Sequence, residues 1–230
     1  MRVPGQINRL RSVFEEFRSS QHPPIVLLRE IIYVLLLVGG IALALFLVSG
    51  TWPAVVTIES GSMIPHMNVG DLVFVVEENR FGNLQTWADG KETGYTAFGD
   101  YGDVVIYRPN GAGAVTPIIH RAMTWADAAT VALYFPDSHE GYITKGDNNP
   151  AIDQGALLPG LGVLEPVKEE WLVGRALFAI PLLGYIPLHA IELAIIILVL
   201  LVVQEWWKRR QKPGDEPAED MDESAQRSGK

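Results

Sequence analysis

Two serines flank a glycine within residues 59–65, which read Glu-Ser-Gly-Ser-Met-Ile-Pro. A serine close to a glycine and a proline lies on bent, accessible backbone, so its hydroxyl and its peptide N–H can face one substrate carbonyl. That arrangement makes Ser62 a candidate nucleophile. Taken alone the motif is weak, because Ser-Gly-Ser tripeptides are usually surface turns.

A histidine interrupts an apolar strand pattern further along the chain, at His120 within the segment 118–123. Histidine is the usual side chain for taking a proton from serine, because its ordinary pKa of about 6.5 lies near neutrality. The alternative is a half-buried histidine whose ring is satisfied by a backbone carbonyl. For a single histidine that alternative is the better interpretation, so the role of general base depends on a partner serine.

Two carboxylates six residues apart, Asp147 and Asp153, follow in a turn-rich segment. Residues 146–150 read Gly-Asp-Asn-Asn-Pro, which is strong turn chemistry and can be explained as that alone. A serine hydrolase nevertheless needs a third group to hold the imidazole tautomer and to stabilise the imidazolium formed during attack. Either aspartate can orient His120, and the spacing leaves the choice open.

The chain contains no cysteine and only five histidines. A thiol nucleophile, a disulfide framework and a cysteine-based metal site are therefore excluded. No His-Glu-x-x-His motif or histidine cluster is present, so we expect neither a metal nor another cofactor. Four histidines are expected to be ordinary surface or interfacial residues: His22, His66, His139 and His189.

The net charge of −9 is concentrated in the middle of the chain, where residues 51–178 carry 16 acidic and 7 basic side chains. No basic patch or stripe is present, which argues against nucleic-acid binding. The acidic balance is compatible with a high-salt habitat.

An apolar run at residues 31–48 has eighteen residues without a charge. At about 1.5 Å per residue a helix of that length covers about 27 Å, close to one hydrocarbon core. Cleaved signal peptides have shorter apolar cores of about 7–15 residues, so we expect an uncleaved transmembrane anchor at 31–49. The arginines before it predict that residues 1–30 are cytoplasmic and that the following domain lies outside.

A second apolar run, at residues 190–203, is followed by Trp-Trp-Lys-Arg-Arg at 206–210. Paired tryptophans and then basic residues are typical of a helix that leaves the bilayer on the cytoplasmic side. Because fourteen residues are short for a span, the run is expected to include 186–189 or to lie partly in the interface. The alternative is an apolar core helix. We expect a membrane-associated segment and second transmembrane helix at 181–207, and a disordered cytoplasmic tail at 208–230.

The residues between the two runs have a β-like pattern, rich in Val, Ile, Tyr and Phe between Gly, Asn, Pro and Asp breaks. Residues 79–101 are Gly- and Thr-rich without a pattern and are interpreted as a loop or insertion. The predicted fold is mainly β, a catalytic domain at 50–180 flanked by two terminal transmembrane helices. The expected strands are residues 71–77, 103–108, 117–123, 130–135 and 141–144, with 171–180 as a further candidate.

Together these segments resemble the signal peptidase I family, most closely its serine–histidine branch of archaea and the eukaryotic endoplasmic reticulum. The likeness runs from the first anchor to about residue 187, and the segment 79–101 and the acidic balance are most like halophilic archaeal members. The matching segments are residues 60–65 with 70–71 for the nucleophile box, 119–121 for the general-base box, and 144–149 with Asp153 for the aspartate box.

The resemblance implies a serine mechanism in which Ser62 attacks the scissile carbonyl and His120 takes its proton. Asp153 would orient His120, while Asp147 would support the loop or supply a second carboxylate. The oxyanion would be held by the backbone N–H of Ser62 and the hydroxyl of Ser60.

The bacterial branch of the family uses a lysine base, but His120 occupies that position here, so the lysine mechanism does not carry over. Lys145 is expected to be a loop lysine next to Asp147. The implied function is a membrane-bound serine endopeptidase that removes N-terminal signal peptides from exported preproteins. The alternative is a non-catalytic, membrane-anchored β-domain subunit or surface protein.

The expected partners are preproteins with signal peptides and the lipid bilayer. Whether accessory membrane subunits are required is left open. The expected location is the cell membrane, with two spans and the catalytic domain on the extracytoplasmic face.

Overall fold

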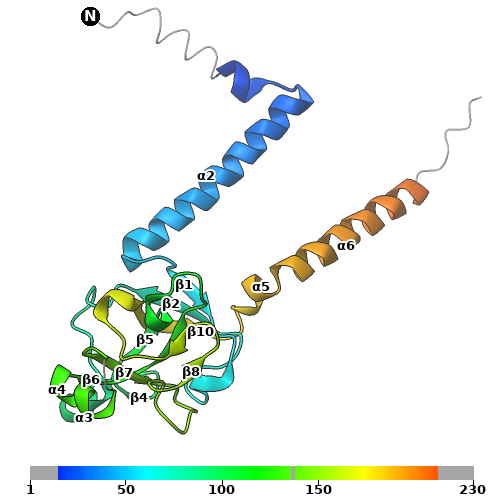
Figure 1. Ribbon diagram of the computed structural model, residues 1–230. Coiled ribbons are helices and arrows are strands. Elements are labelled where there is room, and N and C mark those ends of the chain that lie inside the picture. Colours follow the sequence, from blue (N-terminus) through cyan, green and yellow to red (C-terminus); the bar gives the residue numbers. More distant parts are fainter. Residues whose placement is uncertain (1–14, 136–137, 212–230) are drawn as a thin grey trace, which may run out of the picture. The chain divides into compact units, whose positions relative to one another are not determined.

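A six-stranded antiparallel sheet forms the centre of the protein in the computed structural model, which describes residues 15–135 and 138–211. The strand order is β1-β2-β10-β5-β6-β7, so the last strand in the chain lies in the middle of the sheet (Figure 1). The six strands are β1 (Val55–Thr57), β2 (Leu72–Val76), β5 (Val104–Tyr107), β6 (Ile118–Ala126), β7 (Gly141–Lys145) and β10 (Leu172–Ile180). The prediction of a mainly β domain is confirmed.

Strand β5 is buried on both faces because each face of the sheet packs against its own core. Val104 and Ile106 lie in one cluster with the buried Met63. Val105 and Tyr107 belong to a second cluster on the opposite face. Alternate side chains of a strand point to opposite faces, so the continuous Val-Val-Ile-Tyr run follows from this double burial.

Small elements complete the domain around the sheet. Two short hairpins are β3 (Thr96–Ala97) with β4 (Asp100–Tyr101), and β8 (Leu157–Leu158) with β9 (Gly162–Val163). The described residues also form three single turns of 3-10 helix: η1 (Gly61–Met63), η2 (Pro109–Gly111) and η3 (Glu169–Trp171).

The predicted strand at residues 130–135 is wrong, since the chain forms helix α4 (Ala128–Tyr134) there. The Asp127 side chain accepts a hydrogen bond from the Thr130 backbone N–H at 2.8 Å and caps the helix. Capping satisfies a donor that has no partner inside a helix. This local bond outweighs the β-propensity of the Thr, Val and Tyr side chains.

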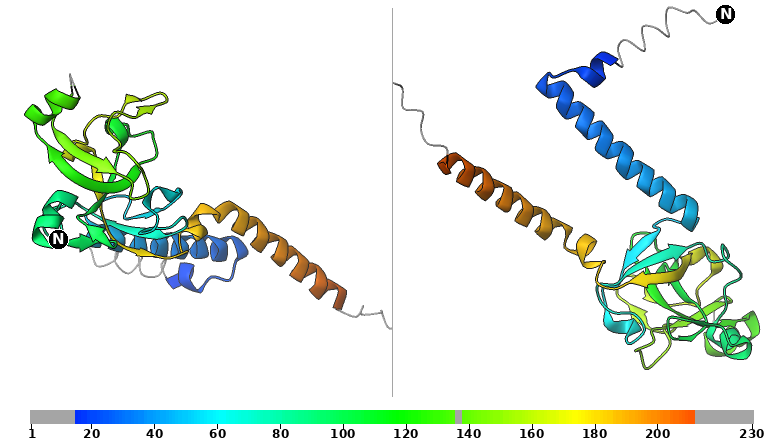
Figure 2. Two further views of the ribbon diagram at one scale, coloured as in Figure 1. Left: turned by 90° about the horizontal axis from the view of Figure 1, so that it is seen from below. Right: turned by 180° about the vertical axis from the view of Figure 1, so that it is seen from behind.

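The predicted loop at residues 79–101 is also more regular than expected, because it contains helix α3 (Trp87–Thr93) and the β3–β4 hairpin. Thr86 and Asp89 form a capping box in which each side chain bonds the backbone N–H of the other. Both α3 and α4 lie at the periphery of the domain, away from the end where α2 enters (Figure 2).

Helix α2 (Pro23–Ser49) is a 27-residue apolar helix that begins eight residues before the predicted anchor. A proline at its start is compatible with the helix because the first N–H groups have no intrahelical acceptor. Leu45, near its end, packs against the buried Ala54 and Phe74 of the β domain.

The described part of the C-terminal segment, residues 186–211, belongs to a unit separate from the β domain. The chain passes through the short helix α5 (Tyr185–Leu188) into helix α6 (Ala190–Gln211). By length and composition both α2 and α6 can cross a membrane. The predicted tail lies outside the described residues from position 212 onward, as do residues 1–14 of the predicted cytoplasmic segment.

Candidate active site

Strand β6 positions His120 beside the centre of the sheet, opposite Val105 of β5. The side chain of Ser62 comes from η1, which is held by the fully buried Met63. Asp153 follows β7, and its backbone N–H donates to the Thr144 carbonyl at 2.9 Å. The structure therefore gathers residues 62, 120 and 153 from three separate parts of the chain.

The ring of His120 is joined to Asp153 by a short hydrogen bond, 2.6 Å from Nδ1 to Oδ2. Both residues are buried, with 8% and 7% of their surface exposed. The same carboxylate oxygen accepts hydrogen bonds from Thr144 Oγ1 at 2.7 Å and from Tyr107 Oη at 3.0 Å. Asp153 is thus surrounded by donors.

The protonation state of Asp153 follows from these contacts. Burial alone would raise its pKa, but the hydrogen bond and charge of His120 and the hydroxyls of Thr144 and Tyr107 outweigh burial and hold the pKa below its usual value. Burial and the negative charge of Asp153 raise the pKa of Tyr107, so its hydroxyl stays protonated and donates. The carboxylate is ionised at neutral pH.

An ionised carboxylate can only accept hydrogen bonds, so Nδ1 of His120 must carry the proton of the 2.6 Å bond. In the neutral ring Nε2 then has a free lone pair. Nε2 lies beside Gly146 and close to the backbone of Ser62, since a Cβ added to Gly146 would lie 2.9 Å from Nε2 and 2.7 Å from the Ser62 carbonyl oxygen. The arrangement provides a proton acceptor next to the serine.

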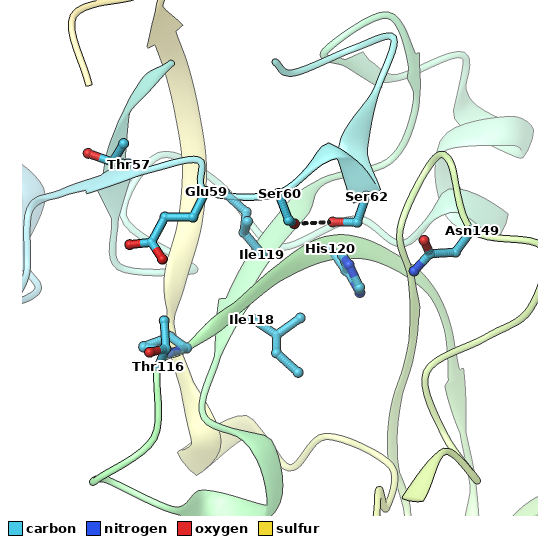
Figure 3. Close-up of a pocket in the computed structure, with 10 residues that line it drawn as sticks. Thr57, Glu59, Ser60, Ser62, Thr116, Ile118, Ile119, His120 and Asn149 are labelled. Atoms are coloured by element: carbon cyan, nitrogen blue, oxygen red, sulfur yellow. Dashed lines mark hydrogen bonds between the residues drawn. The ribbon is translucent and has the colours of Figure 1, made fainter. Parts of the chain in front are cut away.

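Ser62 and His120 line the same cleft, which has a volume of about 430 Å³ (Figure 3). The hydroxyl of Ser62 lies 3.2 Å from the hydroxyl of Ser60. Within the described structure it makes no hydrogen bond to His120. Catalytic hydrogen bonds are often long or unformed without substrate, and rotation about the Ser62 side-chain bond is a small movement.

Asp147 does not contact His120 but joins two other residues of the site. It accepts hydrogen bonds from both Nε and Nη2 of the buried Arg121, at 2.8 and 2.7 Å. Its Oδ2 also pairs with Nδ1 of His66 at 2.8 Å. The carboxylate therefore ties the strand that carries the histidine to the segment that follows the serine.

Asn148 fastens the same loop directly to the nucleophile segment. Its backbone N–H donates to the Ser62 carbonyl at 2.8 Å, and its side-chain amide donates to the Gly61 carbonyl at 3.1 Å. These bonds fix the backbone on both sides of the Ser62 side chain.

Two sequence interpretations need correction. His66 was expected to be an ordinary surface or interfacial residue, but it is half-buried and its ring is bound to Asp147 of the site. Lys145 was expected in a loop, but it is the last residue of strand β7, opposite Arg121. The loop begins only at Gly146, because the strand ladder continues through the lysine.

Sequence reasoning did not find the contributions of Tyr107, Thr144 and Asn148. Thr144 and Asn148 lie within the turn-rich segment that was recognised, so proximity was an available signal for them. No such signal existed for Tyr107, because an aromatic residue is expected in a buried apolar strand without any functional role. Among the described residues no group of three or more His, Asp or Glu side chains can hold a metal ion.

Comparison with known proteins gives relatives that share one description, signal peptidase complex catalytic subunit SEC11. The relative from Schizophyllum commune is 27% identical over 173 residues, 70% of this chain and 77% of that protein. One from Ajellomyces capsulatus is 30% identical over 146 residues, 62% of this chain and 67% of that protein. One from Pyrenophora tritici-repentis is 30% identical over 142 residues, 62% and 66% of the two chains. The chain belongs to the signal peptidase I family.

The predicted resemblance to this signal peptidase family is therefore confirmed, in its endoplasmic reticulum branch. No family model matches the chain. The relatives named above are fungal, so they give no support to the predicted likeness to halophilic archaeal members.

Proposed function

We propose that this signal peptidase family member is a membrane-bound serine endopeptidase that removes N-terminal signal peptides from exported preproteins. The observation that carries the proposal is the 2.6 Å bond from His120 to Asp153, which leaves Nε2 of the ring free beside Ser62 in the cleft. The relatives named as signal peptidase catalytic subunits support the same reaction.

In the proposed mechanism the Ser62 hydroxyl turns from Ser60 toward His120 and attacks the scissile carbonyl carbon. Nε2 takes the hydroxyl proton as the new C–O bond forms, and the resulting imidazolium is stabilised by Asp153. The same proton then passes to the leaving amine as the C–N bond breaks, which gives an acyl-enzyme. Nε2 then takes a proton from a water molecule whose oxygen attacks the ester carbonyl. As the ester C–O bond breaks, that proton passes to the Ser62 oxygen and the carboxylic acid product is released.

The oxyanion of the tetrahedral intermediate is proposed to bind the backbone N–H of Ser62 and the hydroxyl of Ser60. Ser62 is the second residue of η1, and N–H groups at the start of a helix have no acceptor within it. The 3.2 Å separation of the two serine hydroxyls supports this role for Ser60. Loss of one such donor typically costs about 3 kcal/mol of transition-state stabilisation.

Helices α2 and α6 are proposed to be transmembrane spans, with the catalytic domain on the extracytoplasmic face. Ser62 lies 13 residues after Ser49, the end of α2, so even fully extended chain would place it within about 45 Å of that point. This short tether favours a cleavage site close to the bilayer surface. Preproteins and the lipid bilayer are the proposed partners, together with accessory membrane subunits, as the word complex in the relatives' name suggests.

The test is cleavage of a preprotein by the full chain in detergent micelles. We expect one cut that releases the signal peptide, and loss of at least about 10³-fold in rate for Ser62→Ala. Ser19→Ala, a change outside the cleft, is the matched control and should cleave normally. Intact preprotein after incubation with the unaltered chain would instead favour a non-catalytic, membrane-anchored β-domain subunit.

A further inference from the structure

The cleft beside Ser62 carries a single carboxylate among the described residues that line it, that of Glu59. The floor is largely apolar, with Pro117, Ile118 and Ile119 on the side of β6. Figure 3 shows the Glu59 carboxylate between Thr57 and Thr116, away from Ser62 and His120. One end of the cleft is therefore catalytic and the other is negatively charged.

The charge of Glu59 is not used inside the protein. Its side chain is exposed, and no hydrogen bond or ion pair engages its carboxylate in the described part of the chain. The aspartates of the site, in contrast, have hydrogen-bond partners inside the protein: Asp153 bonds His120, and Asp147 bonds Arg121. Among the described residues that line the cleft, only Glu59 therefore has a carboxylate available to meet a charge on the bound substrate.

The position of Glu59 limits which substrate residue it can face. It precedes Ser62 by three residues, and three extended residues span at most about 10 Å. A substrate peptide bound in extended form advances about 3.3 Å per residue. The side chain opposite Glu59 therefore lies within about three residues of the cleaved bond, on one side of it.

We propose that Glu59 is a specificity-determining residue, which favours substrates with a basic side chain within three residues of the cleaved bond and disfavours substrates with an acidic one there. The inference rests on the proposed function and names the charge preference of that same site. Because the carboxylate is exposed, the discrimination between lysine and glutamine is expected to be about 1.4- to 5-fold. It should weaken with salt, since exposed charges are screened over about 10 Å at 0.1 M ionic strength.

The experiment uses the full chain in detergent micelles and a series of preproteins that differ at one position. Lysine, glutamine or glutamate is placed in turn at each of the three residues before and after the cleaved bond, and kcat/KM is measured at low and high salt. We expect one position at which lysine exceeds glutamine and glutamine exceeds glutamate. Glu59→Gln should remove this order, and Glu59→Lys should reverse it.

The matched control is Glu92→Gln, which removes the same charge from an exposed site on α3 that does not line the cleft. It should keep the lysine preference of the unaltered chain. The inference would be overturned if Glu59→Gln kept the same lysine preference as the unaltered chain, or if Glu92→Gln lost that preference too. Either result would indicate a general attraction of basic substrates by the acidic domain.

A binding measurement separates this inference from the proposed function. The affinity of the Ser62→Ala variant, with and without Glu59→Gln, is followed by anisotropy for fluorescent peptides that carry lysine or glutamate in turn at each of the same six positions. If the unaltered chain cuts nothing but binds lysine peptides preferentially, and this preference depends on Glu59, then the proposed peptidase function is wrong and the charge preference is supported. Cleavage without any charge preference would overturn the inference and leave the peptidase intact.

Discussion

Asp153 determines which proton the site can move. Three donors converge on one of its oxygens, from His120, Thr144 and Tyr107. They keep the carboxylate ionised in spite of its burial. An ionised carboxylate holds the proton of the ring on Nδ1 and leaves Nε2 free to accept one from Ser62. In the proposed mechanism, the proton acceptor is therefore in the correct tautomer before substrate binds.

Asp153→Asn should lower kcat by about 10³- to 10⁴-fold. The new amide can donate to Nδ1, which would move the ring proton to Nε2 and block acceptance from Ser62. The rate of preprotein cleavage measures the effect. Asp127→Asn is the control, because asparagine also caps α4 and the residue lies outside the cleft. Near-native turnover of Asp153→Asn would show that the ring is held by another group.

The same substitution should change how stability depends on pH. The folded pKa of Asp153 is lowered, so its contribution to the free energy of unfolding is complete above the unfolded value of about 3.9 and is lost as pH falls through the folded pKa. The melting temperature of the unaltered chain should therefore fall more steeply with decreasing pH below about pH 4 than the melting temperature of Asp153→Asn. Parallel curves between about pH 2 and 7 would contradict the lowered pKa.

At the scale of elements, the loop that begins at Gly146 joins the proposed base, His120, to the proposed nucleophile, Ser62. Asp147 holds Arg121, the neighbour of His120 on β6, while Asn148 donates to the Ser62 carbonyl. Through these contacts the loop fixes the position of η1 relative to the sheet. We therefore expect displacement of the loop to change the distance between Ser62 and His120.

Gly146→Ala should reduce cleavage by about 10²-fold, a typical result of displacing reacting groups by about 1 Å. A Cβ at this position would lie 2.7 Å from both the Ser62 carbonyl oxygen and Asn149 Nδ2 and 2.9 Å from His120 Nε2, so the loop or these neighbours must shift. Gly113→Ala is the matched control, since no atom lies within 4 Å of its added Cβ. Cleavage rates and melting temperatures of both variants are compared. Equal rates would contradict the close packing of the loop against the site.

The sequence was sufficient for elements whose pattern is set by burial. Strands β2, β5, β6, β7 and β10 were predicted within a few residues, because short apolar runs bounded by turn residues are typical of buried strands. It was insufficient where one side chain decides the local structure. Asp127 converts a run with β-propensity into α4, and Thr86 with Asp89 starts a helix in a stretch that has no periodicity.

The site could be predicted as a set of segments but not as a set of contacts. Residues 62, 120 and 153 were named from their types and from the family resemblance. The separate partners of Asp147 could not be found, because His66 and Arg121 meet it only through pairing of distant segments. The hydroxyl of Tyr107 is equally hidden, since a buried strand tyrosine looks like ordinary core.

At the scale of the whole molecule, apolar surface and charge are separated, with exposed apolar side chains on α2 and acidic side chains on the β domain. Helix α2 carries large exposed apolar side chains along its length, such as Leu35, Leu36 and Leu37. Exposure of that much apolar surface to water is unfavourable by about 25 cal/mol per Å², so a lipid environment stabilises the helix. The acidic β domain, in contrast, suits an aqueous compartment.

The absence of cysteine makes the proposed topology directly measurable. Single substitutions Ser19→Cys, Glu92→Cys and Lys208→Cys place one thiol before α2, one in the β domain and one near the end of α6. Arginines precede α2 and a basic cluster follows the tryptophans of α6, and such residues are retained on the cytoplasmic side. We therefore expect a membrane-impermeant maleimide to label only Glu92→Cys in intact cells expressing the chain. After the membrane is opened with detergent, all three should be labelled, which verifies that each thiol is reactive. Labelling of Lys208→Cys in intact cells would mean that α6 lies on the outer surface and that α2 alone anchors the enzyme. Labelling of Ser19→Cys would mean that the orientation is the reverse of the proposed one, with the cleft on the wrong side for exported preproteins.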